Sequence, residues 1–244
     1  MTAEWSLREA DLPVLARPAP LPAVLPGATF VDPDSAEAVR THLDNVVPAL
    51  ESLRSQSGRL AAWGVELAHR LLRGQRLLAA GNGGSAAEAQ HLTAELVGRF
   101  DGERVPFSAI SLHSESSAVT AIANDYGYDE VFARQVRAHG RSGDVLMLLS
   151  TSGKSPNLLR AAEAAARLNI TTWALTGTGP NPLADACSEA VMVDAVNANA
   201  QEGHLIALHA VCRAFDLEVA RRSSTDAQDH GVLNFGLQKR GGHA

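Results

Sequence analysis

The chain of 244 residues has only two cysteines and no long apolar run. Cys187 and Cys212 lie far apart and form no CxxC pair, so neither a disulfide framework nor a cysteine zinc site is indicated. The longest apolar run, around Met147, is far shorter than the roughly 20 residues that cross a bilayer. No basic region followed by an apolar stretch opens the sequence, so we expect no secretory leader. These absences favour a cytoplasmic protein with reduced thiols.

Lysine is also scarce, since only Lys154 and Lys239 occur among the 21 basic residues. The formal net charge is -6 and the isoelectric point is about 5.8. Binding to phosphate backbones depends on clustered lysine and arginine, so this balance argues against a nucleic-acid-binding surface. With 45% hydrophobic residues, the chain can bury one ample core.

The sequence pattern divides the chain into three parts. Residues 1–34 are rich in proline and predict an extended arm, residues 35–222 predict a single domain, and residues 223–244 predict a flexible tail. Apolar residues at intervals of three and four predict a helix from Ser35, capped by Asp34 or Ser35 and bent or split at Pro48. Further helices are predicted over 57–72 and, at the end of the domain, over 200–222.

Between these helices, short apolar segments alternate with helical patterns. The five apolar segments are residues 76–81, 107–113, 144–150, 171–177 and 190–195. Buried strands separated by helices are typical of a parallel sheet with right-handed crossovers. The predicted fold class is therefore α/β, a three-layer sandwich.

A glycine-rich loop, Gly81-Asn82-Gly83-Gly84-Ser85, joins the first predicted strand to a helix. Ligands of open parallel sheets bind beyond the carboxyl ends of strands, where the free N–H groups of helix N-termini attract anions. Glycines let the backbone approach a ligand closely, and Ser85 can cap the helix or donate to a ligand. An ordinary tight turn explains the same residues, so this loop alone leaves both interpretations open.

A second loop follows the third predicted strand, and it is rich in hydroxyl groups. Pro156 stands where the first helical residue is expected, which makes Ser155 the N-cap. The spacing differs from the GxxxxGK[ST] of nucleotide-binding loops, so the cradle favours a sugar phosphate over a nucleotide. A serine-rich cap without a ligand is the alternative, and Lys154 suits either the phosphate or solvent. The hydroxyl-bearing residues are Ser150, Thr151, Ser152 and Ser155.

Four side chains able to bind metal or move protons lie on two predicted helices. His91 and Glu95 are four residues apart and share one helix face, a spacing also typical of a solvated ion pair. Gln201 and His209 are eight residues apart, about 80° around a helix axis and about 12 Å along it. They can converge only on something between their tips, and ordinary helix surface or a core histidine is the alternative. His204 falls to one side of that stripe.

Four collinear runs together resemble the phosphoheptose isomerase branch of the SIS (sugar isomerase) family: residues 81–100, 121–136, 150–157 and 201–209. The resemblance covers residues 35–220. It implies a flavodoxin-like sheet of five parallel strands and a homotetramer with active sites at subunit interfaces. The implied reaction interconverts sedoheptulose 7-phosphate and D-glycero-D-manno-heptose 7-phosphate.

The resemblance also implies roles for individual residues. It implies that one divalent ion, zinc by family precedent, is bound by His91, Glu95, Gln201 and His209, and that Glu95 and His209 form the acid/base pair. The implied phosphate and loop contacts are Ser85, Ser150, Thr151, Ser152 and Ser155. The implied sugar-side contacts are Asn82, Arg99 and Asp125, and the implied substrate-binding set also includes Gly83, Gly84, Asn124 and Gln201. The chain departs from the pattern at Ala198, where the family commonly has a polar residue, and this bears on the exact substrate.

Two other functions fit parts of the same pattern. One is a non-catalytic SIS protein that binds the bacterial replication initiator, which shares both loops but lacks the acid/base pair. The other is a sugar-phosphate-sensing regulator, which would need a partner domain such as a helix-turn-helix. Because Glu95 and His209 are both present and no such domain is evident, the sequence favours the isomerase.

Overall fold

The computed structural model describes residues 32–229, and the side chains of Asn197 and of residues 225–229 within that range are left undescribed. Two compact units are distinguished, Met1–Arg40 and Thr41–Ala244. The arm predicted over 1–34 falls almost wholly outside the described residues, as does most of the tail predicted over 223–244. Among residues 32–229, no helix is long and apolar enough to span a membrane.

The first helix, α1 (Pro33–Asp44), begins two residues earlier than predicted. Its cap is neither Asp34 nor Ser35, because the Asp32 carboxylate accepts hydrogen bonds from both the backbone N–H and the hydroxyl of Ser35, at 3.2 and 3.3 Å. The prediction of the capping residue was therefore wrong. Pro33 is the first helical residue, where a proline loses no intrahelical hydrogen bond.

A break at Asn45 separates α1 from α2 (Val46–Ser55), and α3 (Ser57–Leu72) follows at once. Of the two predictions for Pro48, a bend or a split, the structure confirms that the helix is split. The split precedes Pro48 because a proline fits the first turn of a helix, in which no N–H donor is required.

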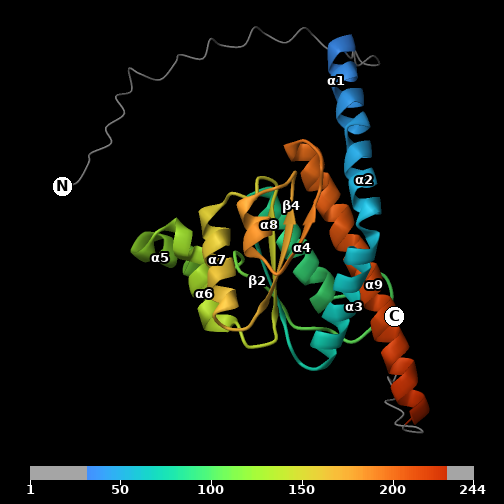
Figure 1. Ribbon diagram of the computed structural model, residues 1–244, viewed down its shortest axis with the longest axis vertical. Coiled ribbons are helices and arrows are strands. Elements are labelled where there is room, and N and C mark those ends of the chain that lie inside the picture. Colours follow the sequence, from blue (N-terminus) through green and yellow to red (C-terminus); the bar gives the residue numbers. More distant parts are fainter. Residues whose placement is uncertain (1–31, 230–244) are drawn as a thin grey trace, which may run out of the picture. The chain divides into compact units, whose positions relative to one another are not determined.

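All five predicted strands form one parallel sheet (Figure 1). In chain order they are β1 (Leu77–Gly81), β2 (Ala109–Ser111), β3 (Val145–Ser150), β4 (Thr171–Thr176) and β5 (Glu189–Met192). Their spatial order is β2-β1-β3-β4-β5, which is the flavodoxin-like order. The predicted α/β three-layer sandwich is confirmed.

Helices cover both faces of this sheet (Figure 1). Strand β1 shows why, since Leu77 and Ala79 pack into one core while Leu78 and Ala80 pack into the other. The first core lies beneath α2, α3, α4 (Gly84–Val97) and α9 (Asn197–Asp229). The second lies beneath α6, α7 and α8, with α5 and the 3-10 helix η2 beside them: α5 (Ser116–Tyr126), η2 (Tyr128–Glu130), α6 (Val131–His139), α7 (Pro156–Ala166) and α8 (Pro182–Ala186).

The last helix, α9, is longer than predicted and extends past Arg222 to Asp229. Its buried residues Leu208, Val211, Phe215 and Val219 follow helical spacing and face the first core. The start of the predicted tail is therefore helical. The same helix carries Gln201, His204 and His209.

Candidate active site

The two predicted anion loops lie side by side at the carboxyl edge of the sheet. They follow β1 and β3, which are paired neighbours with Gly81 opposite Leu149. From this edge the chain enters α4 on one face and α7 on the other, so the loops flank the switch point of the topology. Open α/β sheets bind their ligands in the crevice at such a point.

A reciprocal amide pair joins the two loops. Asn82 Nδ2 donates to Asn157 Oδ1 at 3.0 Å, and Asn157 Nδ2 donates to Asn82 Oδ1 at 2.9 Å. The hydroxyl of Tyr128 also donates to Asn82 Oδ1, at 3.0 Å. Asn82 was predicted as a sugar contact, but here its side chain ties the loops together. Asn157, at the start of α7, and Tyr128 lie in the recognised runs, yet no local pattern predicts a bond between residues 75 positions apart.

The loop after β3 divides its hydroxyl groups between two tasks. The Ser150 hydroxyl accepts from the N–H of Gly153 at 3.0 Å, and the Ser152 hydroxyl accepts from the N–H of Lys154 at 3.3 Å, so both hold the loop. Ser155 is the N-cap of α7, as predicted, but its side chain makes no capping bond. Within the described residues, Ser155 and Thr151 keep their hydroxyl groups unengaged, which suits them to a ligand.

Gly153 is required for this loop. Its φ is +60°, and a Cβ placed there would lie 2.0 Å from Oδ1 of the buried Asn181. Another residue would be strained by the backbone and would also collide with that amide. The Asn181 amide in turn donates to Thr176 Oγ1 at 2.9 Å and accepts from the N–H of Ala184 at 3.0 Å, so it cannot move aside without losing both bonds.

The start of α4 is open to a ligand through its backbone. Its N-cap residue is Gly83, so no side chain caps the first turn. Ser85, a predicted phosphate contact, is only 6% exposed. A Cβ on Gly84 would lie 1.7 Å from Nε2 of Gln201, which shows that the side chain of Gln201 rests directly against the first residue of α4.

Farther along the same two helices, His91, Glu95 and His209 converge. Their ligand atoms all lie within 4.8 Å of one another. His91 Nε2 lies 2.9 Å from His209 Nε2 and 3.2 Å from Glu95 Oε1. The side chains of His91 and Glu95 are 42% and 18% exposed, so the cluster is accessible.

Helices α4 and α9 run parallel, and their contacts keep a nearly constant offset in the sequence. Gly84 meets Gln201, Glu88 meets His204 at 3.8 Å, and His91 meets His209. Gln201 therefore lies about 12 Å along α9 from His209, at the phosphate end of the contact. Of the four predicted metal ligands, three come together and Gln201 is placed beside Gly84.

The surroundings of the cluster hold it in place. Arg104 donates to the backbone oxygen of Glu95 at 2.6 Å and pairs with Asp216 at 2.8 Å, while the ring of Phe100 lies 5.3 Å from that of His209. Burial, reinforced by the charges of Glu95 and Asp216, raises the pKa of the Cys212 thiol to about 12. Cys212 is a buried residue of the first core and is not among the converging donor groups.

Two predicted substrate contacts, Asn124 and Asp125, are placed away from this cluster, and a third, Arg99, points to a backbone oxygen. Arg99 is exposed and donates to the backbone oxygen of Asp101 at 3.2 Å. Asn124 and Asp125 are exposed on α5, where the Asn124 amide donates to the Asp125 carboxylate at 2.8 Å. Figure 1 shows α5 beyond α7, on the opposite side of the sheet from α9. A single chain does not bring all predicted site residues together.

The His91, Glu95 and His209 donor set fits a divalent metal ion. Two imidazoles and one carboxylate are ligands of zinc and other borderline ions, and catalytic zinc sites commonly have three protein ligands and an open position. The convergence of three donor atoms within 4.8 Å is the observation that favours this fit.

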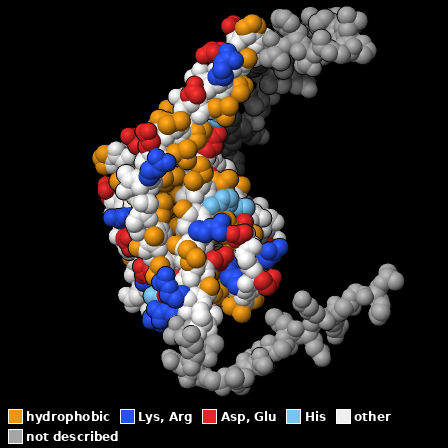
Figure 2. All heavy atoms as spheres, turned by 90° about the vertical axis from the view of Figure 1, so that its right-hand side faces the viewer, with side chains coloured by type: hydrophobic (Ala, Val, Ile, Leu, Met, Phe, Trp, Pro, Cys, Tyr) orange, Lys and Arg blue, Asp and Glu red, His pale blue; other side chains and the backbone are white. Residues whose placement is uncertain are grey.

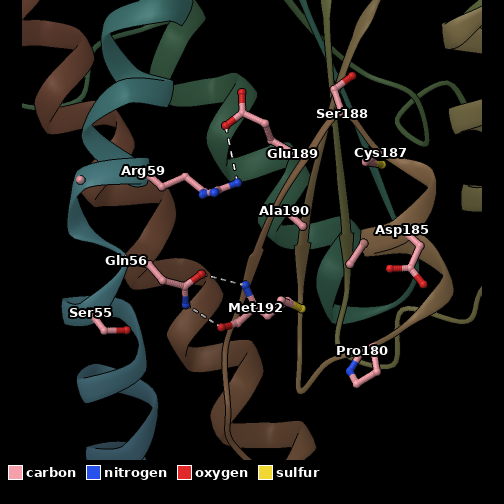
Figure 3. A pocket seen from close by; sticks show the side chains of 12 residues that line it. Ser55, Gln56, Arg59, Pro180, Asp185, Cys187, Ser188, Glu189, Ala190 and Met192 are labelled. Atoms are coloured by element: carbon pink, nitrogen blue, oxygen red, sulfur yellow. Dashed lines mark hydrogen bonds and ion pairs between the residues drawn. The ribbon is translucent and has the colours of Figure 1, made fainter.

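A separate hollow of about 760 Å³ lies at the edge of the sheet beside β5 (Figure 3). Gln56 closes one end, because its amide accepts from the N–H of Met192 and donates to the oxygen of Met192. Arg59 and Glu189 form an ion pair of 3.7 Å across another part. No predicted site residue lines this hollow, so it is distinct from the candidate active site.

Comparison with known proteins identifies the class first. The sequence profile of the SIS domain matches residues 41–177. A solved phosphoheptose isomerase from Francisella tularensis superposes with a TM-score of 0.71 and 32% sequence identity, over 75% of this chain and 98% of that one. The one from Neisseria gonorrhoeae gives 0.69 and 37%, with the same coverage. The fold and the two loops are therefore those of a SIS domain.

Relatives by sequence narrow the class. A phosphoheptose isomerase of Streptomyces coelicolor is 59% identical over 181 residues, which are 74% of this chain and 78% of that protein. One from Shewanella sediminis is 47% identical over 154 residues, 62% of this chain and 78% of that protein. This chain belongs to the phosphoheptose isomerase branch of the SIS family.

Proposed function

We propose that this protein is an aldose–ketose isomerase that interconverts sedoheptulose 7-phosphate and D-glycero-D-manno-heptose 7-phosphate. The observation that carries the proposal is the convergence of Glu95, His91 and His209 within 4.8 Å, on helices whose other ends reach the anion loops. The names of the related proteins supply the substrate class.

The reaction moves a carbonyl group between C1 and C2, so a carbon-bound proton must be removed and one returned to the neighbouring carbon. In the proposal, the Glu95 carboxylate takes the proton from one carbon, and His209 serves the other carbon or the oxygens. The two residues approach from different helices, α4 and α9, and so can address a substrate lying between them. A bound zinc ion would stabilise the negative charge that develops on the enediolate oxygens.

His91, Glu95 and His209 would hold that ion. Glu95 would then be both a metal ligand and the base. These two tasks compete, because a carboxylate bound to metal is a weaker base. The exposure of the His91 side chain, at 42%, leaves room for an open coordination position. Gln201 would act from its place beside Gly84 as a substrate contact.

The phosphate would bind at the switch point. Ser155 and Thr151 offer hydroxyl groups there, and the first turns of α4 and α7 offer N–H donors. His91 is seven residues beyond Gly84, or about 10 Å along the helix axis. This separation suits a long sugar phosphate that is anchored at one end and reacts at the other. Ala198 is exposed near the start of α9 and offers no polar group to the sugar.

The proposal includes assembly of several copies, with each site completed by another subunit. Two observations support it. Asn124 and Asp125 are placed on the far side of the sheet from His209, so one chain alone leaves part of the predicted site incomplete. Figure 2 shows hydrophobic side chains gathered on the face of α2, α3 and α9, where a groove of about 350 Å³ is lined by Leu50, Leu60 and Ile206. A homotetramer in the cytoplasm is the arrangement that we propose.

A protein that only binds a partner would need the fold and loops but no acid/base pair. The convergence of Glu95 with two histidines is unexplained by that function. The replication-initiator-binding and sugar-sensing alternatives are therefore not favoured.

The direct test is incubation of zinc-loaded protein with sedoheptulose 7-phosphate in deuterated water, followed by NMR. We expect an aldose phosphate, deuterium at C1 or C2 where the base exchanges with solvent, and loss of activity with a chelator. A sample of Glu95→Gln under the same conditions is the matched control. No conversion by intact, zinc-loaded wild type would contradict the proposal, and a panel of other sugar phosphates would then identify a different substrate.

A further inference from the structure

A buried histidine and a buried glutamate lie between α4 and α9, midway between the phosphate end and the metal-ligand cluster. His204 is fully buried, and Glu88 is 8% exposed. His204 Nδ1 lies 3.8 Å from Glu88 Oε2, beyond hydrogen-bond distance. Within the described residues, both ring nitrogens of His204 and Oε2 of Glu88 have no hydrogen-bond partner.

Such a pair needs an explanation, because most buried polar groups are hydrogen-bonded and an unpaired one is costly. Apolar side chains would fill this space at lower cost. The neighbouring buried residues of the two helices are apolar members of the first core, with Ala89 and Leu92 on α4 and Ala200, Ala207 and Leu208 on α9. Contacts of that kind hold two helices together but do not strongly fix how far one helix is shifted along the other.

We infer that Glu88 and His204 set the register of α4 against α9 and thereby position the metal ligands. Buried polar pairs between helices are best known for fixing register at some expense of stability. Glu88 precedes His91 by about one turn, and His204 precedes His209 by five residues. A slip of one turn between the helices would move His91 past His209 by about 5 Å and would disperse the cluster.

The inference rests on the proposed function, in which His91, Glu95 and His209 bind zinc. It gives Glu88 and His204 a positioning role rather than a catalytic one, because neither side chain is accessible to substrate. Active-site groups must be held within about 0.5 Å of their working geometry, and residues behind the ligands commonly provide that precision.

The test separates register from stability with three variants. Glu88→Gln keeps the size of the side chain but removes its charge. The double variant Glu88→Met with His204→Leu replaces both polar groups by apolar ones, which is often close to neutral for stability. Leu67→Ala, on α3 in the first core, is the control that destabilises the fold by leaving a cavity while keeping both polar side chains of the pair.

Zinc affinity is measured on metal-free protein by competition with a coloured chelator, together with Tm, kcat and KM. We expect the double variant to keep a Tm near that of wild type and to bind zinc about 10- to 100-fold more weakly. Its kcat should fall more than its KM rises. Leu67→Ala should lower Tm and leave zinc affinity within about twofold of wild type. Wild-type zinc affinity in the double variant would overturn the inference. A loss of zinc affinity in Leu67→Ala as large as that in the double variant would also overturn it.

A metal-free measurement keeps the inference independent of the reaction. Spin labels at Val97 on α4 and Leu217 on α9, both exposed and both outside the groove lined by Leu50, Leu60 and Ile206, report the distance between the helices by pulsed EPR in protein diluted with unlabelled chains. We expect a single narrow distance in wild type and a broadened or shifted one in the double variant. Unchanged distances in the double variant would refute the register role, and a changed distribution would sustain it. Either result stands even if the wild-type protein fails to isomerise any heptose phosphate.

Discussion

Two of the glutamate–histidine pairs that join α9 to other helices differ in how well they are hydrogen-bonded. In the C-terminal half, Glu218 Oε1 lies 2.7 Å from His69 Nε2 of α3, and Arg222 and Arg221 donate to the same carboxylate at 2.9 and 3.0 Å. The Arg222 hydrogen bond, with that from His69, lowers the pKa of Glu218 from 4.5 to about 2.

In the N-terminal half, Glu88 and His204 lie 3.8 Å apart with unpartnered atoms on both sides. The first pair resembles an ordinary stabilising network, whose donors and acceptors are matched. The second pair should stabilise the fold no more than two apolar side chains would. It lies between the phosphate end and the metal-ligand cluster. The incomplete hydrogen bonding of Glu88 and His204 is what the register role proposed above would explain, because such a pair fixes the position of the helices at some expense of stability.

The sharpest contrast between the metal-ligand cluster and the Glu218–His69 pair is expected in turnover. Glu95→Gln should lower isomerisation by about 10²- to 10⁴-fold, the usual contribution of a general acid or base, while Tm stays near that of wild type. Glu218→Gln is the matched control and should leave turnover nearly unchanged. Rates are compared by NMR of sedoheptulose 7-phosphate. Substantial activity in Glu95→Gln would remove Glu95 from the base role.

The second largest contrast between the metal-ligand cluster and the Glu218–His69 pair is expected in zinc affinity. His209→Asn removes one imidazole of the cluster, so we expect zinc affinity to fall at least 10-fold and turnover to fall with it. His69→Asn makes the same change in the C-terminal pair and should leave zinc affinity unchanged. Both are measured by chelator competition. Equal affinities for His209→Asn and wild type would assign His209 to proton transfer alone.

A smaller effect is expected at the phosphate end. Ser155→Ala removes one hydroxyl from the loop after β3, and the loss of one hydrogen bond is worth about 3- to 10-fold in binding. We expect KM to rise by that factor with kcat nearly constant, since the phosphate is held alike in the ground and transition states. Ser152→Ala is the comparison, because its hydroxyl already accepts from the N–H of Lys154. A fall in kcat alone for Ser155→Ala would contradict the anchoring role.

The smallest effect concerns stability and its pH dependence. The pKa of Glu218 is lower in the folded protein, at about 2, than its ordinary value of 4.5. Its contribution to stability is therefore full above about pH 4.5 and is lost as the pH falls toward 2. Glu218→Gln should lower Tm by a few degrees at pH 7, and the difference should shrink below pH 4.5. A difference that is constant from pH 7 to pH 3 would show that the carboxylate charge is not its source.

Most of the fold could be predicted because its signals are local. The strand from Leu77 to Gly81 is an apolar run ended by glycine, and the parallel order follows from alternation with helices. Local signals failed at the ends of helices, where a single side chain can decide which residue is the first or the last of the helix. The cap of α1 is Asp32 instead of Asp34 or Ser35, and α9 extends to Asp229 because the pattern gave no stop after Arg222.

The candidate site could be predicted less completely. His91 and Glu95 share a face of one helix, so their proximity is a matter of helical spacing. The approach of His209, 118 residues later, depends on how α9 packs against α4. The same packing places Gln201 beside Gly84 and encloses Glu88 with His204. From the sequence, His204 was expected only to lie to one side of Gln201 and His209.

By itself the sequence determined the alternation of strands and helices, the two anion loops and the chemical identity of the donor groups, because each depends on residues close together in the chain. Only the tertiary structure decided which distant side chains meet: Asn82 with Asn157, His91 with His209, and Glu88 with His204. The physical reason is that such contacts depend on the packing and register of whole elements, which no short stretch of sequence specifies alone.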